Sequence, residues 1–127
     1  MKFTDWKGVF TLAQELGGKN TEAAFRSSIN RTYYSCYNLS CAFCDIRNIY
    51  KKKANGEDHE FLVKALKQHR NDEVKKVGGN LNKLRGKRIH ADYNSSEEVT
   101  KGDSDFSLKL GDELIKSLDF LSKAISL

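Results

Sequence analysis

The spacing of apolar residues along the chain predicts helices. Apolar positions recur at steps of three and four residues, and no segment shows the alternation that is typical of a β-strand. The chain contains no proline that would interrupt a helix, and glycine pairs and polar stretches mark the breaks instead. We therefore expect an all-α protein.

Two helices are expected in the first part of the chain. The first covers residues 4–16 and stops at Gly17-Gly18, with an apolar face formed by Trp6, Val9, Phe10, Ala13 and Leu16. The second begins at Asn20 or Thr21 as N-cap and continues to about Tyr50, which makes it the longest element. Its three- and four-residue steps place on one face Phe25, Ile29, Tyr33, Cys36, Tyr37, Ser40 and Phe43.

Three more helices are expected after a polar loop at residues 51–58. A short one is marked by Phe61, Leu62, Ala65 and Leu66. The next starts near Asp72, with an apolar stripe formed by Val74, Val77, Leu81, Leu84 and Ala91. Gly78, Gly79 and Gly86 weaken this helix by about 1 kcal/mol each, so a kink or break at Gly78-Gly79 stays open. After a polar loop at residues 94–103, Ser104 is expected to cap a final helix, whose inward face comprises Leu110, Leu114, Leu118, Leu121 and Ile125.

Length and composition indicate one domain that covers residues 1–127. A chain of 127 residues can bury a core but is too short for two domains. It has no apolar run near the roughly 20 residues of a membrane span, and its N-terminus lacks the features of a secretory signal, so we expect a cytoplasmic protein. Cys36, Cys41 and Cys44 form an odd set, which favours reduced thiols packed in the core.

Positive charge is concentrated in one part of the chain. The formal net charge is +5, but residues 64–88 hold nine bases against Asp72 and Glu73, which gives a local charge of +7. Such a concentration is typical of a surface that binds a polyanion. For Lys75 and Lys76, a solvated helix face is an adequate alternative explanation.

Two segments combine side chains that could carry chemistry. Residues 25–37 hold two arginines and three tyrosines on one helix, where Arg31 shares a face with Tyr34. A surface arginine stacked on a tyrosine is the simpler interpretation of this pattern. In residues 84–93, Arg85, Arg88 and Asp92 share another face, and His90 is close to them in sequence.

The second segment has the groups that metal-free RNA cleavage requires. An arginine can bind the scissile phosphate bidentately and oppose the charge of the transition state. A histidine can move the proton of the ribose 2′-OH or of the leaving 5′ oxygen. DNA lacks that internal nucleophile and would not be cut in this way. His59 and His69 have no visible partner in the sequence and are expected to be exposed to solvent.

These segments resemble the HEPN family, small helical domains that are widespread in prokaryotic toxin and defence systems. Residues 25–34 resemble the family's helix with an Arg-x-Tyr-Tyr core, and residues 88–93 resemble the Arg-x-x-Ala-Asp-Tyr ending of one branch. The resemblance implies an up-and-down bundle of four to five helices. It also implies a homodimer that brings the motifs of both subunits into one basic cleft.

For nuclease members of the family, the signature is an arginine followed after four to six residues by a histidine. Arg85 and His90 have this spacing, although Gly86 stands where a polar residue often follows the arginine. The resemblance then implies a metal-independent endoribonuclease without a cofactor, in which Arg85 or Arg88 holds the phosphate and His90 is the acid or base. The residues expected to help bind RNA are Arg26, Arg31, Tyr34, Lys83, Lys87 and Asp92.

The nuclease motif can be aligned with the sequence in a second way that fits equally well. If Arg88 is the motif arginine, Tyr93 takes the histidine position, and tyrosine, with an ordinary pKa near 10, is a poor base at neutral pH. The chain would then bind RNA, a nucleotide or a partner protein, such as a small nucleotidyltransferase antitoxin, without catalysis. A third interpretation is a purely structural helical protein that dimerises through the Tyr33 and Tyr34 face.

Overall fold

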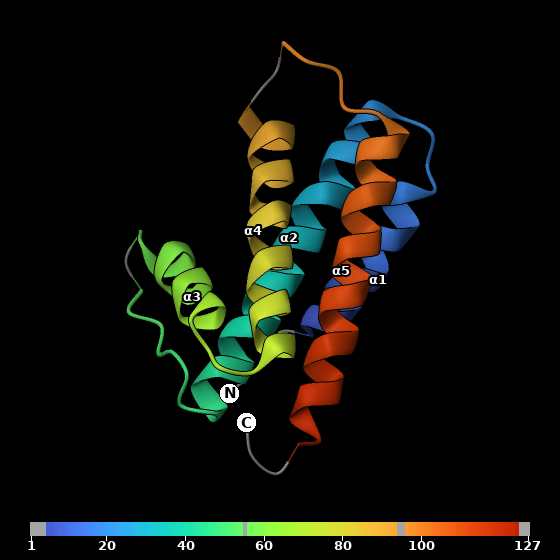
Figure 1. Cartoon of the computed structure of the whole chain (residues 1–127). Helices are drawn as coiled ribbons and strands as arrows, with labels where there is room; N and C mark the ends of the chain where they lie inside the picture. Colours follow the sequence, from blue (N-terminus) through green and yellow to red (C-terminus); the bar gives the residue numbers. More distant parts are fainter. Residues whose placement is uncertain (1–4, 55, 94–95, 125–127) are drawn as a thin grey trace.

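The computed structural model describes residues 5–54, 56–93 and 96–124 and contains five α-helices (Figure 1). They are α1 (Trp6–Gly17), α2 (Glu22–Ile46), α3 (Asp58–Lys67), α4 (Asp72–Tyr93) and α5 (Lys101–Ser122). The described ranges contain no strand, which confirms the all-α prediction. Within the same ranges, no helix has the length and apolar character needed to cross a membrane.

The helix starts follow local capping patterns. Asp5 caps α1 by accepting a hydrogen bond from the Gly8 amide, and Thr21 caps α2, as predicted, by accepting one from the Ala24 amide. The predicted Thr4 start of the first helix and the inward Ile125 of the last one lie outside the described residues. Helix α2 ends at Ile46, before the predicted Tyr50, and Asn48 beyond it has a left-handed φ of 58°.

The predicted start of the last helix is wrong. Thr100, and not Ser104, is the N-cap of α5: its side chain accepts from the Asp103 amide, and the Asp103 carboxylate accepts from the Thr100 amide. Ser104 lies inside the first turn and is fully buried. Because the cap is four residues earlier than expected, the polar loop before α5 is shorter than the sequence suggests.

Helix α4 is unbroken through Gly78-Gly79, where the sequence left a kink open. Gly78 lies against α3, because a Cβ atom added there would be 2.9 Å from the Cβ of Leu66. A Cβ added to Gly79 would meet nothing within 4 Å. The first glycine is thus a close-approach position for two helices, whereas the second faces open space.

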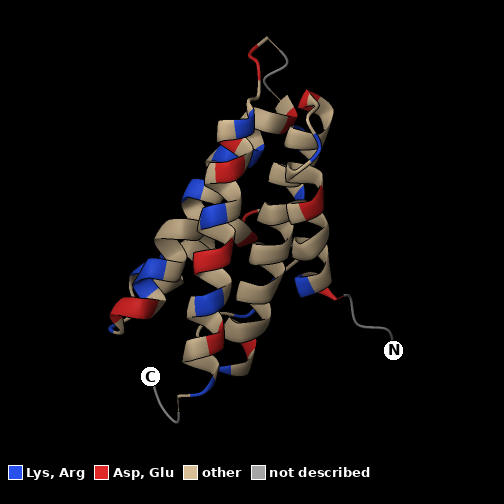
Figure 2. Ribbon diagram, turned by 90° about the vertical axis from the view of Figure 1, so that its right-hand side faces the viewer, with Lys and Arg blue, Asp and Glu red and all other residues tan. Residues whose placement is uncertain are grey.

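Helix α2 is the centre of the bundle and packs against α1, α4 and α5, while α3 packs on the outer side of α4 (Figure 1). The apolar stripe predicted for α4 is buried in full, which confirms it. All of it except Ala91 lies in one core cluster with the predicted leucines of α5, and Ala91 lies in a second cluster with Phe25 and Ile29. Among the apolar residues that marked the third helix, Phe61 has an exposed side chain. In Figure 2, basic and acidic residues are interspersed along the helices of the face shown.

The cysteines are free, as predicted, and Cys36 and Cys44 are buried while Cys41 is half-buried. Burial raises the pKa of the Cys36 and Cys44 thiols to about 12. Both are therefore protonated at neutral pH and act as packing groups in the core.

Candidate nucleic-acid interface

Arg88 is the centre of a polar cluster between α2 and α4. Its Nε donates to Asp92 Oδ2 at 3.1 Å, and its Nη2 donates to the hydroxyl oxygens of Tyr34 at 2.9 Å and Tyr93 at 3.2 Å. The rings of Tyr33, Tyr34 and Tyr93 have their centroids 5.6, 5.2 and 5.4 Å from the guanidinium carbon. With only 17% of its side chain exposed, Arg88 is held in one orientation.

Asp92 orients this arginine from the same helix. It lies one turn after Arg88, and its Oδ2 also accepts a hydrogen bond from Asn30 Nδ2 on α2 at 2.9 Å. The carboxylate therefore links the two helices and fixes one edge of the guanidinium. The Nη1 of Arg88 makes no hydrogen bond within the described part of the chain.

Arg85 lies one turn before Arg88 and is held more loosely. Its Nη1 is 3.9 Å from Oε1 of Glu60 on α3, and the Glu60 side chain is mostly exposed to solvent. An exposed pair at this distance contributes little to stability and is easily screened by salt. The positive charge of Arg85 is consequently available to an anion that approaches the cluster.

His59 lies behind the two arginines and is 7% exposed, so the prediction of a solvent-exposed histidine is wrong here. Its Nδ1 is 2.7 Å from the Tyr33 hydroxyl, and the two rings lie in contact. Helix α3 turns the imidazole towards α2, although the neighbouring residues in sequence are polar. The other predicted exposed histidine, His69, is half-buried and accepts a hydrogen bond from the Asn71 amide.

Burial, with the positive charges of Arg85 and Arg88 adding to it, lowers the pKa of His59 to about 4. The Asn82 side chain opposes part of this shift, but it does not complete a hydrogen bond to the buried Nε2. Burial also raises the pKa of Tyr33 to about 12, despite the two arginines. At pH 7 both partners of the Tyr33–His59 hydrogen bond are therefore neutral.

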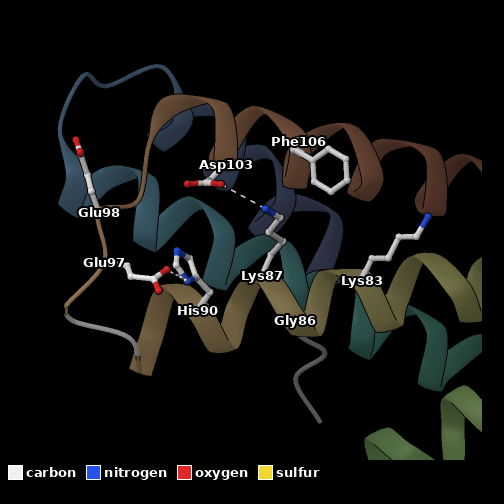
Figure 3. A pocket seen from close by; sticks show the side chains of 8 residues that line it. All are labelled: Lys83, Gly86, Lys87, His90, Glu97, Glu98, Asp103 and Phe106. Atoms are coloured by element: carbon white, nitrogen blue, oxygen red, sulfur yellow. Dashed lines mark hydrogen bonds and ion pairs between the residues drawn. The ribbon is translucent and has the colours of Figure 1, made fainter.

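His90 lies on a different side of α4. It follows Arg88 by two residues, which turns it by about 200° around a helix. Its Nδ1 is 3.4 Å from Glu97 Oε2, and the imidazole lines a groove of about 580 Å³ between α4 and α5 (Figure 3). Within the single chain, the structure thus brings Tyr93 to Arg88 and separates His90 from it.

The predicted RNA-binding lysines belong to the groove of His90. Lys83 and Lys87 line it together with Asp103 and Phe106 of α5 (Figure 3). Lys87 Nζ is 3.3 Å from Asp103 Oδ1 and 5.2 Å from the centre of the Phe106 ring. Hydrogen bonds from Thr100 and Lys87 lower the pKa of Asp103, so this carboxylate is charged at neutral pH.

The two arginines of α2 make contacts within the protein. Arg26 Nη1 donates to the Ala91 carbonyl oxygen at 2.6 Å, and its Nη2 donates to the Glu97 carbonyl oxygen at 2.7 Å. It thereby ties the end of α4 to the start of α2. Arg31 donates to Ser27 Oγ one turn earlier on α2. A contact of either arginine with RNA stays a prediction.

Sequence reasoning missed three residues near these surfaces. Asn30 is one turn before Tyr34, so its place on the same face was visible in the spacing. The positions of His59 and Phe106 depend on how α3 and α5 pack against α4, and no local signal gives that packing. Among the described residues, no group of three or more His, Cys, Asp or Glu side chains is placed to hold a metal ion.

Comparisons of the chain with protein-family models, curated proteins and solved structures find no match. The resemblance to HEPN domains consequently depends on the motif residues themselves. The geometry of those residues is the basis of the proposals below.

Proposed function

We propose that the chain is an RNA-binding protein of the HEPN type that acts as a homodimer. The observation that carries the proposal is the guanidinium of Arg88, which Asp92, Tyr34 and Tyr93 hold in place while Nη1 stays unused. An arginine fixed before its ligand arrives loses less conformational entropy when it binds a phosphate. Arg85, one turn away and loosely paired, supplies a second positive charge.

Aromatic rings beside these cations favour single-stranded RNA as the polyanion. Tyr93 is 70% exposed and lies next to the guanidinium of Arg88. Proteins that bind single strands combine backbone contacts from basic residues with aromatic rings on which bases stack. The high positive charge of residues 64–88 adds a long-range attraction that weakens with salt.

An exposed ridge on α4 supports the proposed homodimer. The ridge comprises Gly79, Asn82, Gly86, Ile89 and Tyr93, which alternate at steps of three and four residues along the helix. A Cβ added to either glycine would meet nothing within 4 Å, and Ile89 is 41% exposed. Two such helices can approach closely, and the ridge has the Arg85 side of α4 on one flank and the His90 side on the other.

Binding of a fluorescent single-stranded RNA tests the role of Arg88. Arg88→Ala should weaken binding by about tenfold or more and reduce the dependence of affinity on salt concentration, because one phosphate contact is lost. Arg88→Lys keeps the charge but not the planar donor pair, so its RNA affinity should lie between those of Arg88→Ala and the wild type. Lys109→Ala, an exposed change of the same charge on α5, is the control.

The proposal is wrong if Arg88→Ala binds RNA as the wild type does while its circular dichroism spectrum and melting temperature are unchanged. A loss of binding with equal loss of helix would reflect unfolding. If Arg88→Ala unfolds, RNA binding is compared between Arg88→Lys and the wild type, because lysine retains the positive charge and most of the side-chain volume.

A second candidate function is metal-independent RNA cleavage, which His90 favours. Its imidazole is partly exposed beside the ridge, and the neighbouring Glu97 is itself largely exposed. As a base, His90 would take the 2′-OH proton while the 2′ oxygen attacks phosphorus. The 5′ oxygen then leaves with a proton from an acid, giving a 2′,3′-cyclic phosphate and a 5′-OH. A nucleotidyltransferase antitoxin as partner remains an expectation from the family resemblance.

Cleavage by this route needs two subunits, because His90 lies on a different side of one α4 from both Arg85 and Arg88. RNA should be cut in EDTA by the wild type and by His69→Ala, but not by His90→Ala. Mixing His90→Ala with Arg85→Ala subunits should restore part of the activity, since a heterodimer would contain one intact combination. Full activity of His90→Ala alone would exclude the catalytic role.

A further inference from the structure

Phe106 is an exposed aromatic side chain in the groove between α4 and α5. It projects from α5 beside the groove shown in Figure 3, and 46% of its surface is exposed. The groove volume of about 580 Å³ lies within the range of sites that hold small ligands. An exposed ring at the side of such a groove is a surface on which a planar ligand can stack.

The charges around the groove indicate which part of a nucleotide fits there. Lys87 is already paired with Asp103, and His90 is paired with Glu97. Of the remaining lining residues, Lys83 contributes one positive charge and Glu98 one negative charge. Three carboxylates line the groove, Glu97, Glu98 and Asp103, against the two lysines, so a phosphate is disfavoured and N–H donors are favoured.

Carboxylates distinguish nucleobases by their exocyclic groups. Cytosine, adenine and guanine each carry an amino group that can donate to a carboxylate, as glutamate and aspartate accept from the cytosine amino group in DNA grooves. At C4, where cytosine has its amino group, uracil has a carbonyl oxygen, which is an acceptor and cannot donate to Glu97 or Glu98. The groove should therefore favour bases with an amino group.

We propose that this groove is a subsite for an amino-bearing nucleobase, which stacks on Phe106 and donates to the carboxylates of Glu97 and Glu98. The inference rests on the proposed function, because the base belongs to the same RNA whose phosphates bind the Arg88 cluster. Lys83, at the far end of the groove from Glu97 in Figure 3, is placed to meet the adjoining phosphate. A free nucleotide offers the same base chemistry and is the other source of the ligand.

Oligocytidylate and oligouridylate of equal length, each with a fluorescent label, test the subsite by anisotropy. Their backbones are the same, so any difference in affinity reports base contacts. The wild type should bind oligocytidylate about tenfold more tightly than oligouridylate. Phe106→Ala should remove most of this difference, Phe106→Tyr should keep it, and Glu98→Gln should reduce it.

Phe120→Ala is the matched control, because Phe120 is also an exposed phenylalanine of α5 but does not line the groove. It should leave both affinities unchanged. Equal binding of the two oligomers by the wild type, or an unchanged preference in Phe106→Ala, would overturn the subsite. Either result leaves the proposed RNA binding intact if Arg88→Ala still weakens binding.

Cytidine and uridine without phosphate test the subsite independently of RNA binding. In an NMR titration at millimolar concentration, cytidine should shift the ring signals of Phe106 and His90 in the wild type, and uridine should shift them less. These shifts would support the subsite even if neither oligomer binds, in which case the proposed function fails. Absence of shifts with cytidine would overturn the subsite.

Discussion

Single side chains in the Arg88 cluster differ in how firmly they are held. Arg88 has hydrogen bonds to a carboxylate and two tyrosine hydroxyls, whereas Arg85 has one long contact with an exposed glutamate. The first guanidinium is preorganised, and the second can move towards a ligand. We expect Arg88 to define where the first phosphate lies and Arg85 to add mainly to the rate of association.

His59 makes the stability of the fold depend on pH. Its pKa is about 4 in the folded protein, below the ordinary 6.5, so between these values the unfolded chain binds a proton that the folded chain does not. The free energy of unfolding should be highest above pH 6.5. It should fall by up to about 3 kcal/mol as the pH decreases to 4. Urea unfolding at pH 7, 5.5 and 4.5 measures this fall.

His59→Gln isolates that contribution, because glutamine can accept from Tyr33 but does not titrate. The variant should lose most of the pH dependence in this window, even if it is less stable at pH 7. His69→Gln is the control and should keep the slope of the wild type. An unchanged slope in His59→Gln would mean that other groups cause the loss of stability at low pH.

At the scale of helices, the contact between α3 and α4 depends on one glycine of a pair. Gly78→Ala should destabilise the protein, because the new methyl group would lie 2.9 Å from the Cβ of Leu66 and 3.2 Å from the Lys67 amide nitrogen. Gly79→Ala meets no atom of its own chain within 4 Å, so helix propensity should stabilise the single chain by up to about 1 kcal/mol, apart from any effect on the proposed ridge contact. Thermal unfolding of both variants measures the difference, and the same sign for both would contradict this packing.

Local patterns predicted most helices because their causes are local. The α4 stripe and the Thr21 cap follow from periodicity and one side-chain hydrogen bond. The start of α5 was misplaced although Thr100 and Asp103 have capping-box spacing, since the polar composition of residues 94–103 suggested a loop. The spacing of apolar residues does not predict the early end of α2. Beyond that end, the backbone of Asn48 has a left-handed conformation.

The candidate site could be predicted only where its contacts are within one helix. Arg88 with Asp92 is a one-turn pair and was visible in the sequence. The burial of His59 depends on the orientation of α3, which no sequence pattern gives. Whether Arg85 of one subunit meets His90 of another depends on pairing of two chains, and the sequence of one chain does not determine that geometry.

At the scale of the whole molecule, α4 divides two surfaces with different chemistry. The Arg88 cluster faces α2 and α3, and the groove with Phe106 faces α5 (Figure 3). The exposed ridge with Ile89 lies between them. If two copies pair along this ridge, both surfaces border the same interface.

Ile89→Asp tests this pairing. A charge placed in a closely packed helix contact loses hydration without a partner, so the variant should be a monomer with unchanged helix content. Light scattering after size-exclusion chromatography should show a dimer for the wild type. Ile46→Asp, at an exposed position of α2 away from the ridge, should remain a dimer. A wild type that is monomeric at tens of micromolar would contradict the homodimer.

The directions in which Tyr93 and His90 point from α4 depend on the number of residues that separate each of them from Arg88. One residue inserted or deleted between Arg88 and His90 would turn everything after it by about 100°. Tyr93 and Asp92 would then leave the guanidinium, and His90 would leave Glu97. This stretch can therefore change in amino-acid type more readily than in length.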